Sequence, residues 1–390
     1  MIINKKSDLM ALIHPQKPLE QPFTNDPQAS YTLASRYYTD ADIYEQEKAA
    51  IFWKSWVYVG HASQLQQAGD YLTTDIHGQQ VLIIMHQGGE LGAFFNVCPH
   101  RGHQLLEGCG NTRVIVCPYH AWCFDQQGTF LRGRNLQDLK QFSEPEFNLK
   151  AVKLELFLGF VFVNLDPNAP AMTEVYAGLA DEIKYYVPKI DEVEHQYHAD
   201  YAVAANWKLL MDNFLECYHC QPAHKDFVDL VDMPSYQTKV HDYYSSHISH
   251  QPSNNNSNAY KVAGEQTFGY AAWFVWPNLT IWVMPGEANV SMLQMHPDGL
   301  AQCHETLDWH GIGQQLNPAS KDAITYLDEV LQPEDIGLCE SVQKGLSSLA
   351  YNQGRFVVDD QRSHLSEHGV HHFQKLVIEA LSNPIRTQTN

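Results

Sequence analysis

The pattern of apolar and polar positions divides the chain into three stretches. From Met1 to about Ser30 the residues are polar and include four prolines, which predicts an extended arm. From Trp56 to about Asp166 the apolar residues form short alternating or buried runs separated by turn signals such as Gln87–Gly89, a pattern that predicts a compact antiparallel β domain. Beyond Asp166, strand-like and helical segments are mixed. Along the whole chain, strands and helices still fall in separate blocks rather than in strict alternation, which favours an α+β fold.

Helix-start signals and apolar residues three or four apart predict several helices. Capping chemistry at 39–42 begins a helix that runs through Phe52, and Thr173 and Asn317 are the expected N-caps of two others, the second with Pro318 in its first turn. Gly269–Met284 is expected to form one or two strands. The other expected helices cover 174–186, about 206–219, 318–330, 335–349 and 371–381, and the strands of the β domain include 71–76, 81–85, 93–97, 114–117 and 157–164.

Length and charge then narrow the class of protein. The 390 residues predict two domains after the arm, and we place the boundaries at 1–38, 39–166 and 167–390. The net charge of −20 argues against binding to nucleic acid or to anionic membranes. No apolar run approaches 18 residues and the N-terminus lacks the features of a signal peptide, so we expect a cytoplasmic protein. Its eight cysteines are then expected to be thiols and metal ligands rather than disulfides.

Two loops of the predicted β domain each offer one thiolate and one imidazole. The ligand candidates are Cys98 and His100 and, after sixteen intervening residues, Cys117 and His120. A zinc site with two Cys and two His usually has both cysteines first, whereas the alternating order fits a Rieske [2Fe–2S] cluster, with two Cys on one iron and two His on the other. Cys109 and Cys123 break the two-loop pattern and are not expected to be ligands.

A second set of metal ligands is predicted after the β domain. Glu216 and His219 would share one face of a helix, and a helix end at Pro222 would let His224 fold back beside His219. Two imidazoles and one carboxylate form the facial triad of a mononuclear Fe(II) oxygenase. The carboxylate is expected from the segment that follows Pro333. The spacing alone does not separate its three acids, Glu334, Asp335 and Glu340.

Together the two sets of ligands resemble the oxygenase (alpha) component of the Rieske non-haem iron oxygenases. The likeness runs from about Ser35 to Leu381. The loop 96–106 looks like the first cluster loop of this family, and the segment Asn206–His224 looks like its iron-site helix. The tail 351–373 is similar to the branch that acts on quaternary ammonium compounds, which includes carnitine, choline and glycine betaine monooxygenases and stachydrine demethylase. The nearest likeness is to carnitine monooxygenases, which share a Glu at the position of Glu216 where most of the family has Asp.

The resemblance implies a fold and a route for electron transfer between the metals. It implies a β Rieske domain, a helix-grip α+β catalytic domain with a mononuclear iron, and a head-to-tail homotrimer. It selects Asp335 as the third iron ligand. It also implies that Glu216 bridges His219 to a cluster histidine, His100 or His120, across the subunit interface and carries the electron between the metals.

The activity implied is a two-component monooxygenase. The enzyme would use O2 to hydroxylate a carbon beside a quaternary nitrogen, and the C–N bond would then break. NADH would supply the electrons through a separate flavin and ferredoxin-type reductase. A carnitine-like substrate would release trimethylamine, and a betaine-type N-demethylation would release formaldehyde. No Gly-x-Gly-x-x-Gly follows a strand, in keeping with a separate reductase.

A quaternary cation is best held by aromatic faces, and Tyr218, Trp276 and Trp282 are the candidates, although the same rings would suit an ordinary core. The alternatives are the alpha subunit of an aromatic-ring-hydroxylating dioxygenase and, from another class, a Rieske electron carrier. The roughly 220 residues after the β domain argue against a carrier. The identity of the substrate and the carbon attacked stay open.

Overall fold

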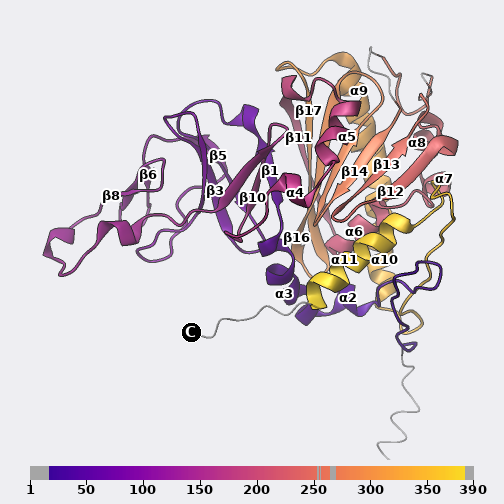
Figure 1. The fold of residues 1–390 in the computed structure, drawn as a ribbon, viewed down its shortest axis with the longest axis horizontal. Helices are drawn as coiled ribbons and strands as arrows, with labels where there is room; N and C mark the ends of the chain where they lie inside the picture. The colour runs from indigo at the N-terminus through magenta and orange to yellow at the C-terminus, as the bar shows by residue number, and fades with distance from the viewer. Residues whose placement is uncertain (1–16, 253, 255, 264–268, 383–390) are drawn as a thin grey trace, which may run out of the picture.

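The computed structural model describes residues 17–252, 254, 256–263 and 269–382, so residues 1–16 of the predicted arm lie outside the described residues. The chain forms an elongated N-terminal β domain beside a larger domain in which helices cover a broad sheet (Figure 1). The segment before the β domain returns to the larger domain, where Tyr31 forms a bridge with Arg355. Two short helices follow it, α2 (Arg36–Thr39) and α3 (Ala41–Ala50), and Asp40 caps α3 within the predicted capping segment.

The N-terminal domain consists of small antiparallel sheets, as the alternating pattern predicts. Their strand orders are β4-β3-β2-β5, β6-β7-β8 and β1-β10-β9. Its own core contains Leu82, Ile84, Trp122 and Phe124. The strands are β1 (Val57–His61), β2 (Asp70–Asp75), β3 (Gln80–Met85), β4 (Leu91–Phe95), β5 (Cys109–Asn111), β6 (Ile115–Val116), β7 (Cys123–Phe124), β8 (Phe130–Arg132), β9 (Lys153–Phe157) and β10 (Phe160–Asn164).

The C-terminal domain is built on one seven-stranded antiparallel sheet. The order is β11-β17-β16-β15-β14-β13-β12. The segment Gly269–Met284 forms two strands of this sheet with Trp276–Asn278 in the turn between them, one of the two arrangements expected. The strands are β11 (Val193–Val203), β12 (Tyr236–Val240), β13 (Tyr244–Ser249), β14 (Ala271–Val275), β15 (Leu279–Val283), β16 (Asn289–Gly299) and β17 (Gln302–Ile312).

Both faces of this sheet are covered, so its central strands are apolar on both sides. On β14, Ala272 and Phe274 pack in the core under the helices, whereas Ala271, Trp273 and Val275 pack in a second core. Strands β1, β9 and β10 and the helices α4 (Met172–Val175) and α5 (Leu179–Tyr186) complete that second core. The sheet therefore connects the two domains.

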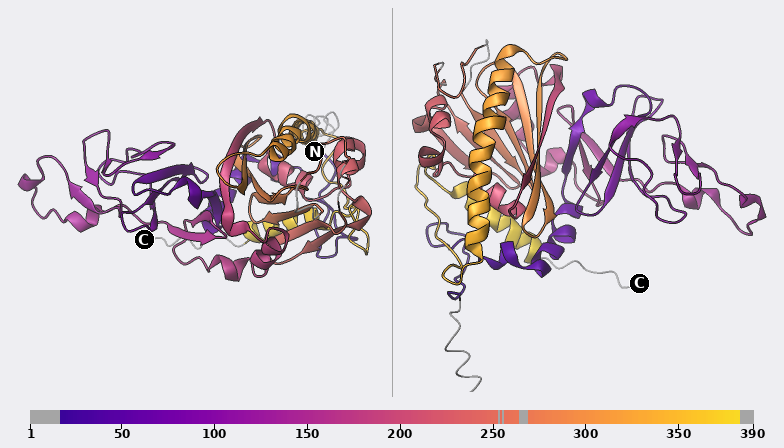
Figure 2. Two further views of the ribbon diagram at one scale, coloured as in Figure 1. Left: turned by 90° about the horizontal axis from the view of Figure 1, so that it is seen from above. Right: turned by 180° about the vertical axis from the view of Figure 1, so that it is seen from behind.

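The helical layer runs across the other face of the sheet, with one long helical segment visible from behind (Figure 2). This segment joins α9 (Pro318–Tyr326), a π-helical turn at Leu327–Leu331 and α10 (Gln332–Leu346) without a break. Asn317 caps it as predicted, its side chain accepting a hydrogen bond from the Ser320 N–H. The helix α11 (His368–Ser382) lies beside α6 (Trp207–Phe214), and α8 (Lys225–Leu230) follows the short α7 (Cys220–Ala223).

Two expectations about the helices α4, α5 and α10 were wrong. The single helix expected over 174–186 is two helices, because Gly178 adopts a left-handed conformation with φ +92° between them, and Thr173 lies inside the first helix rather than capping it. We also expected separate helices at 318–330 and 335–349, but a single helical segment continues through Pro333. Pro333 lies in the first turn of α10, a position where a proline costs no hydrogen bond in most helices.

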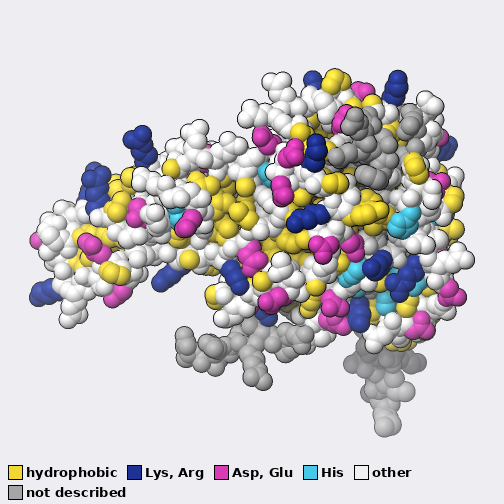
Figure 3. Space-filling view, turned by 45° about the horizontal axis from the view of Figure 1, so that its top comes forward, with side chains coloured by type: hydrophobic (Ala, Val, Ile, Leu, Met, Phe, Trp, Pro, Cys, Tyr) yellow, Lys and Arg dark blue, Asp and Glu magenta, His cyan; other side chains and the backbone are white. Residues whose placement is uncertain are grey.

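The surface carries mixed charge. Acidic and basic side chains are interspersed on the face shown in Figure 3. Within the described part of the chain, no helix is both long and apolar enough to cross a bilayer.

Candidate metal centres and substrate cavity

A break after α6 sets up the second predicted ligand set. Asn206 caps α6 by accepting a hydrogen bond from the Lys208 N–H, but the helix ends at Phe214 rather than near His219. Glu216 and His219 are therefore in a turn and not on a helical face, which corrects the sequence interpretation. Pro222 lies within α7 and does not end a helix. His224 lies at the junction of α7 and α8. The turn before α7 and the change of direction at this junction bring His224 back to His219.

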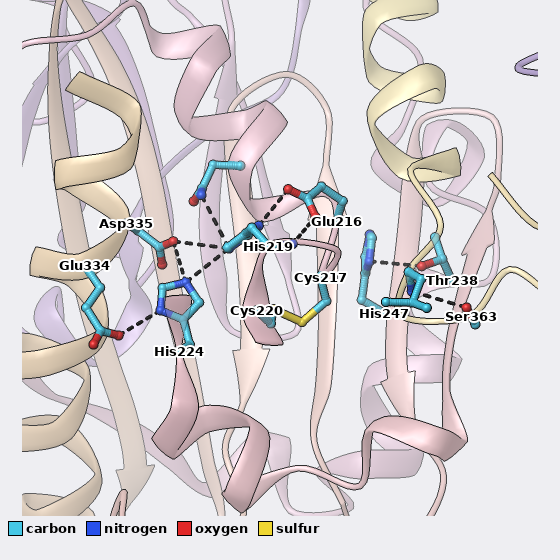
Figure 4. Close-up of a disulfide and its surroundings, with 12 residues drawn as sticks. Glu216, Cys217, His219, Cys220, His224, Thr238, His247, Glu334, Asp335 and Ser363 are labelled. Carbon is cyan, nitrogen blue, oxygen red and sulfur yellow. Dashed lines mark hydrogen bonds and ion pairs between the residues drawn. A yellow bond between two sulfur atoms is a disulfide. The ribbon is translucent and has the colours of Figure 1, made fainter. Parts of the chain in front are cut away.

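His219, His224 and Asp335 converge on one point (Figure 4). The two Nε2 atoms lie 3.1 Å apart, and Asp335 Oδ1 lies 2.9 Å from His224 Nε2 and 3.4 Å from His219 Nε2. Asp335 comes from the first turn of α10, far along the chain from the two histidines. Two imidazoles and one carboxylate on one side of a cavity suit an iron with open coordination positions.

Further carboxylates hold the outer nitrogen of each imidazole. Glu216 Oε1 lies 2.6 Å from His219 Nδ1, and Glu334 Oε2 lies 2.8 Å from His224 Nδ1. Such contacts turn each Nε2 toward a metal and increase its basicity. Glu340 instead accepts a hydrogen bond from the Ala204 N–H, so the three acids that the spacing left unresolved have three different positions.

The electrostatics of the triad favour a cation. Burial opposes the charged form of His219, but its bonds to Asp335 and Glu216 outweigh burial and raise its pKa to about 10. Burial likewise opposes the ionised form of Asp335, but the two imidazoles lower its pKa to about 2. The carboxylates thus stabilise positive charge on the imidazoles, and a divalent metal bound at the same point would take the place of the imidazole protons.

A largely apolar cavity opens beside the triad, and Trp282 lines it. The other two predicted substrate residues do not: Tyr218 is 48% exposed, and Trp276 packs against Phe373. Trp276 lies outside because the chain turns between it and Trp282 instead of continuing as one strand. The lining also includes Leu210, Asn213, Phe214, Glu216, Cys217, His219, Cys220, His224, Phe227, Tyr236, Tyr270, Leu293, Met295, Glu305, Leu331, Gln332, Asp335, Ile336 and Cys339.

A disulfide joins Cys217 to Cys220 on either side of His219, contrary to the expectation that all cysteines are thiols or ligands (Figure 4). The turn that replaces the expected helix brings the two sulfurs together. The other six cysteines are free. A Cys-x-x-Cys spacing was the available sequence signal.

The first predicted ligand set lies at one end of the β domain. Cys98 and Cys117 are buried, and burial together with the adjacent Cys117 thiol raises the pKa of Cys98 to about 11. The rings of His100 and His120 lie 4.6 Å apart nearer the surface, and the buried His120 Nδ1 has no hydrogen-bond partner. Two adjacent thiols inside and two imidazoles outside, one with an unpartnered nitrogen, fit a Rieske cluster.

Comparison with known proteins agrees with both centres. A model described as the Rieske [2Fe-2S] domain matches residues 55–143, and one for the ring hydroxylating alpha subunit (catalytic domain) matches residues 190–383. The chain is 35% identical over 376 residues to the carnitine monooxygenase oxygenase subunit of Escherichia coli K12, covering 96% of this chain and 100% of that one. The chain belongs to the Rieske non-haem iron oxygenases.

As a member of this family, the protein is an oxidoreductase with a Rieske [2Fe–2S] domain and a non-haem iron catalytic domain. It is also 29% identical to the chloroplastic choline monooxygenase of Beta vulgaris, over 97% of this chain and 82% of that one. A crystal structure of the quaternary ammonium Rieske monooxygenase CntA with L-carnitine has a TM-score of 0.83 at 34% identity, covering 93% and 99% of the two chains.

The two alternative functions have less support. Naphthalene 1,2-dioxygenase from Rhodococcus shares the fold, with a TM-score of 0.74 at 18% identity over 90% of this chain and 94% of that one. That likeness extends to the fold alone. A pure electron carrier would have no use for the catalytic domain that follows the Rieske domain.

Proposed function

We propose that this protein is the oxygenase component of a two-component monooxygenase that hydroxylates a carbon beside a quaternary nitrogen. The observation that carries the proposal is an aromatic-lined cavity directly beside the convergent His219, His224 and Asp335. These three residues would hold the mononuclear iron. The cluster would be held by Cys98, His100, Cys117 and His120. When bound, the two metal centres supply O2 activation and electrons.

Each neighbouring residue then has a defined task. Glu216 and Glu334 hold the outer nitrogens of the two histidines, so that only the Nε2 atoms face the metal. The apolar cavity walls exclude bulk water, which strengthens electrostatic contacts within the cavity. The rings of Phe214 and Trp282, stacked with centroids 5.5 Å apart, can present aromatic faces to a quaternary cation.

We further propose a homotrimer in which Glu216 bridges His219 to a cluster histidine of the neighbouring subunit. Glu216 and His219 also line a second hollow, whose walls include the partly exposed apolar side chains Leu338, Val342 and Tyr351. Exposed apolar side chains around a functional group favour a protein interface. One relative, a quaternary ammonium Rieske monooxygenase, is described as using inter-subunit electron transfer.

The reaction consumes O2, two electrons and two protons. One oxygen atom enters the substrate C–H bond and the other leaves as water. A hydroxylated carbon on a positively charged nitrogen loses the amine, because the hydroxyl proton departs as the C–N bond breaks and a carbonyl forms. Attack on a methyl group releases formaldehyde, and attack on the backbone carbon releases trimethylamine. The electrons would come from NADH through a separate reductase, in keeping with the cytoplasmic location that we expect.

The test is turnover with separate quaternary ammonium compounds. Iron-loaded protein, a reductase, NADH and O2 would be incubated with carnitine, γ-butyrobetaine, glycine betaine, choline or proline betaine, and mass spectrometry would follow trimethylamine, formaldehyde and any aldehyde formed. Product from at least one compound is expected. Reduction of the cluster without any product from the series would contradict the proposal and favour the aromatic-ring alternative.

A further inference from the structure

A single acid interrupts the apolar face of β17. Alternate residues Cys303, Leu307 and Trp309 pack in the core beneath the helices, and Glu305 occupies the position between Cys303 and Leu307. Its side chain lines the cavity and is 4% exposed, and its Oε2 has no hydrogen-bond partner. A buried carboxylate without a partner is costly, so a position like this calls for a ligand.

The neighbours of Glu305 do not supply that partner. Met295 is directly opposite on β16, and on β11 the hydroxyl of Tyr201 donates to Asp328 instead. Burial and the nearby charge of Asp335 raise the pKa of Glu305 to about 8, and a cation bound beside it would favour the ionised form. The other two carboxylates in the cavity, Glu216 and Asp335, are bonded to the histidines, which leaves Glu305 as the acid available to a substrate.

The cavity as a whole suits a cation without a carboxylate. Aromatic rings on several elements surround the space, and they can contact the methyl groups of a quaternary ammonium. Among the described residues that line it, none is Lys or Arg. A carboxylate on the substrate would therefore have no Lys or Arg partner among these residues and would face the acid Glu305. The rings are those of Phe214, Phe227, Tyr236, Tyr270 and Trp282.

We propose that Glu305 is the anionic contact for the substrate nitrogen, and that the substrate carries a net positive charge, as choline does, rather than being a zwitterion such as carnitine or a betaine. This inference rests on the proposed function, because it takes the cavity beside the triad as the substrate site. Glu305 is then a specificity-determining residue: it pairs with the cation and disfavours a second carboxylate.

Binding without turnover tests the charge directly. Iron-loaded full-length protein under anaerobic conditions would be titrated calorimetrically with choline, with its neutral carbon isostere 3,3-dimethyl-1-butanol, and with carnitine. Choline is expected to bind roughly 30-fold more tightly than the other two. Glu305→Gln should remove most of that advantage and leave the affinity for the neutral isostere unchanged. Glu340→Gln, which removes a carboxylate outside the cavity, is the matched control and should behave as wild type.

The outcomes separate this inference from the proposed function. Equal binding of carnitine and choline, with no effect of Glu305→Gln, would overturn the role of Glu305 while leaving a quaternary ammonium oxygenase. Loss of the neutral isostere along with choline in Glu305→Gln would show a role in cavity shape and would also overturn it. If no ammonium compound binds or is oxidised, the proposed function itself fails.

Discussion

The described residues include two groups of two histidines and one aspartate in which one ligand atom of each residue lies within 4.8 Å of the others. One group faces the cavity that α6 and α10 help to line. The other lies on β11 and β17, where a strand irregularity between His195 and Tyr197 lets two histidines three residues apart approach the same aspartate. The groups are His219, His224 and Asp335, and His195, His198 and Asp308.

The surroundings of the two groups differ more than their ligand atoms. In the cavity group, each imidazole leaves its Nε2 facing the common point. In the strand group, both nitrogens of His198 are occupied, Nδ1 by Asp308 at 2.6 Å and Nε2 by Asp200 at 3.2 Å. The second oxygen of Asp308 accepts a hydrogen bond from the Tyr58 hydroxyl on β1 at 2.8 Å. The strand group thus joins the two domains, and the comparison shows that ligand type alone does not identify a metal site.

Removing the aspartate of each group should give the largest difference between the two groups, measured as bound iron. Asp335→Ala should lose the mononuclear iron and reduce turnover to background, because it removes the only anionic ligand of the proposed triad, yet keep the visible absorption of the Rieske cluster. Asp308→Ala should retain the iron at wild-type stoichiometry. Iron analysis and visible spectra of both variants check this, and iron loss from Asp308→Ala alone would reverse the assignment of the two groups.

Sequence reasoning reached the fold and the ligand types but not the local geometry that makes the site. Glu216 and His219 are three residues apart, which fits a helical turn, yet the helix ends at Phe214 and the contact forms in a turn instead. Local periodicity could not show this because the packing of α6 against the sheet and α10 decides where the helix ends. Glu305 was missed for a related reason: only strand pairing reveals which face of β17 an alternating residue occupies.

The carboxylates behind the histidines should have the next largest effect. Glu334→Gln weakens the contact that orients His224, so we expect iron affinity to fall by about 10- to 100-fold with the triad itself intact. Competition with a chelator during iron loading measures the change. Glu340→Gln on the same helix is the control. An unchanged affinity in Glu334→Gln would mean that α7 and α8 alone fix the orientation of His224.

The strand group should instead make stability depend on pH. Burial opposes ionisation of Asp308, but its bonds to His195, His198 and Tyr58 hold its pKa well below the usual range, and the Asp308 bond raises the pKa of His198. The stability from Asp308 is present above its unfolded pKa of about 4 and lost on acidification. The stability from His198 is present below about pH 6.5 and lost as pH rises through its raised pKa. The group should therefore stabilise most between those values.

Asp308→Asn should remove this effect. At about pH 6 we expect it to lower the free energy of unfolding by roughly 1–3 kcal/mol, toward the lower end because His198 is half exposed. The difference from wild type should shrink toward pH 9 and toward pH 3. Denaturant unfolding at several pH values measures it, with Asp322→Asn, an exposed aspartate on α9, as the control. A difference that is constant with pH would indicate a packing role without charge.

The smallest effect should come from the disulfide, which only the cavity group possesses. The Cys217–Cys220 link closes a very short loop around His219, so chain entropy limits its stabilisation to about 2 kcal/mol. Reduction should therefore leave the fold intact and accelerate hydrogen exchange at 216–220, whereas the amides of His195 and His198, held in paired strands, should not change. The double variant Cys217→Ser/Cys220→Ser should exchange at the accelerated rate with or without reductant. Unchanged exchange at 216–220 on reduction would mean that the contacts of His219 with Glu216 and Asp335, rather than the disulfide, hold the turn.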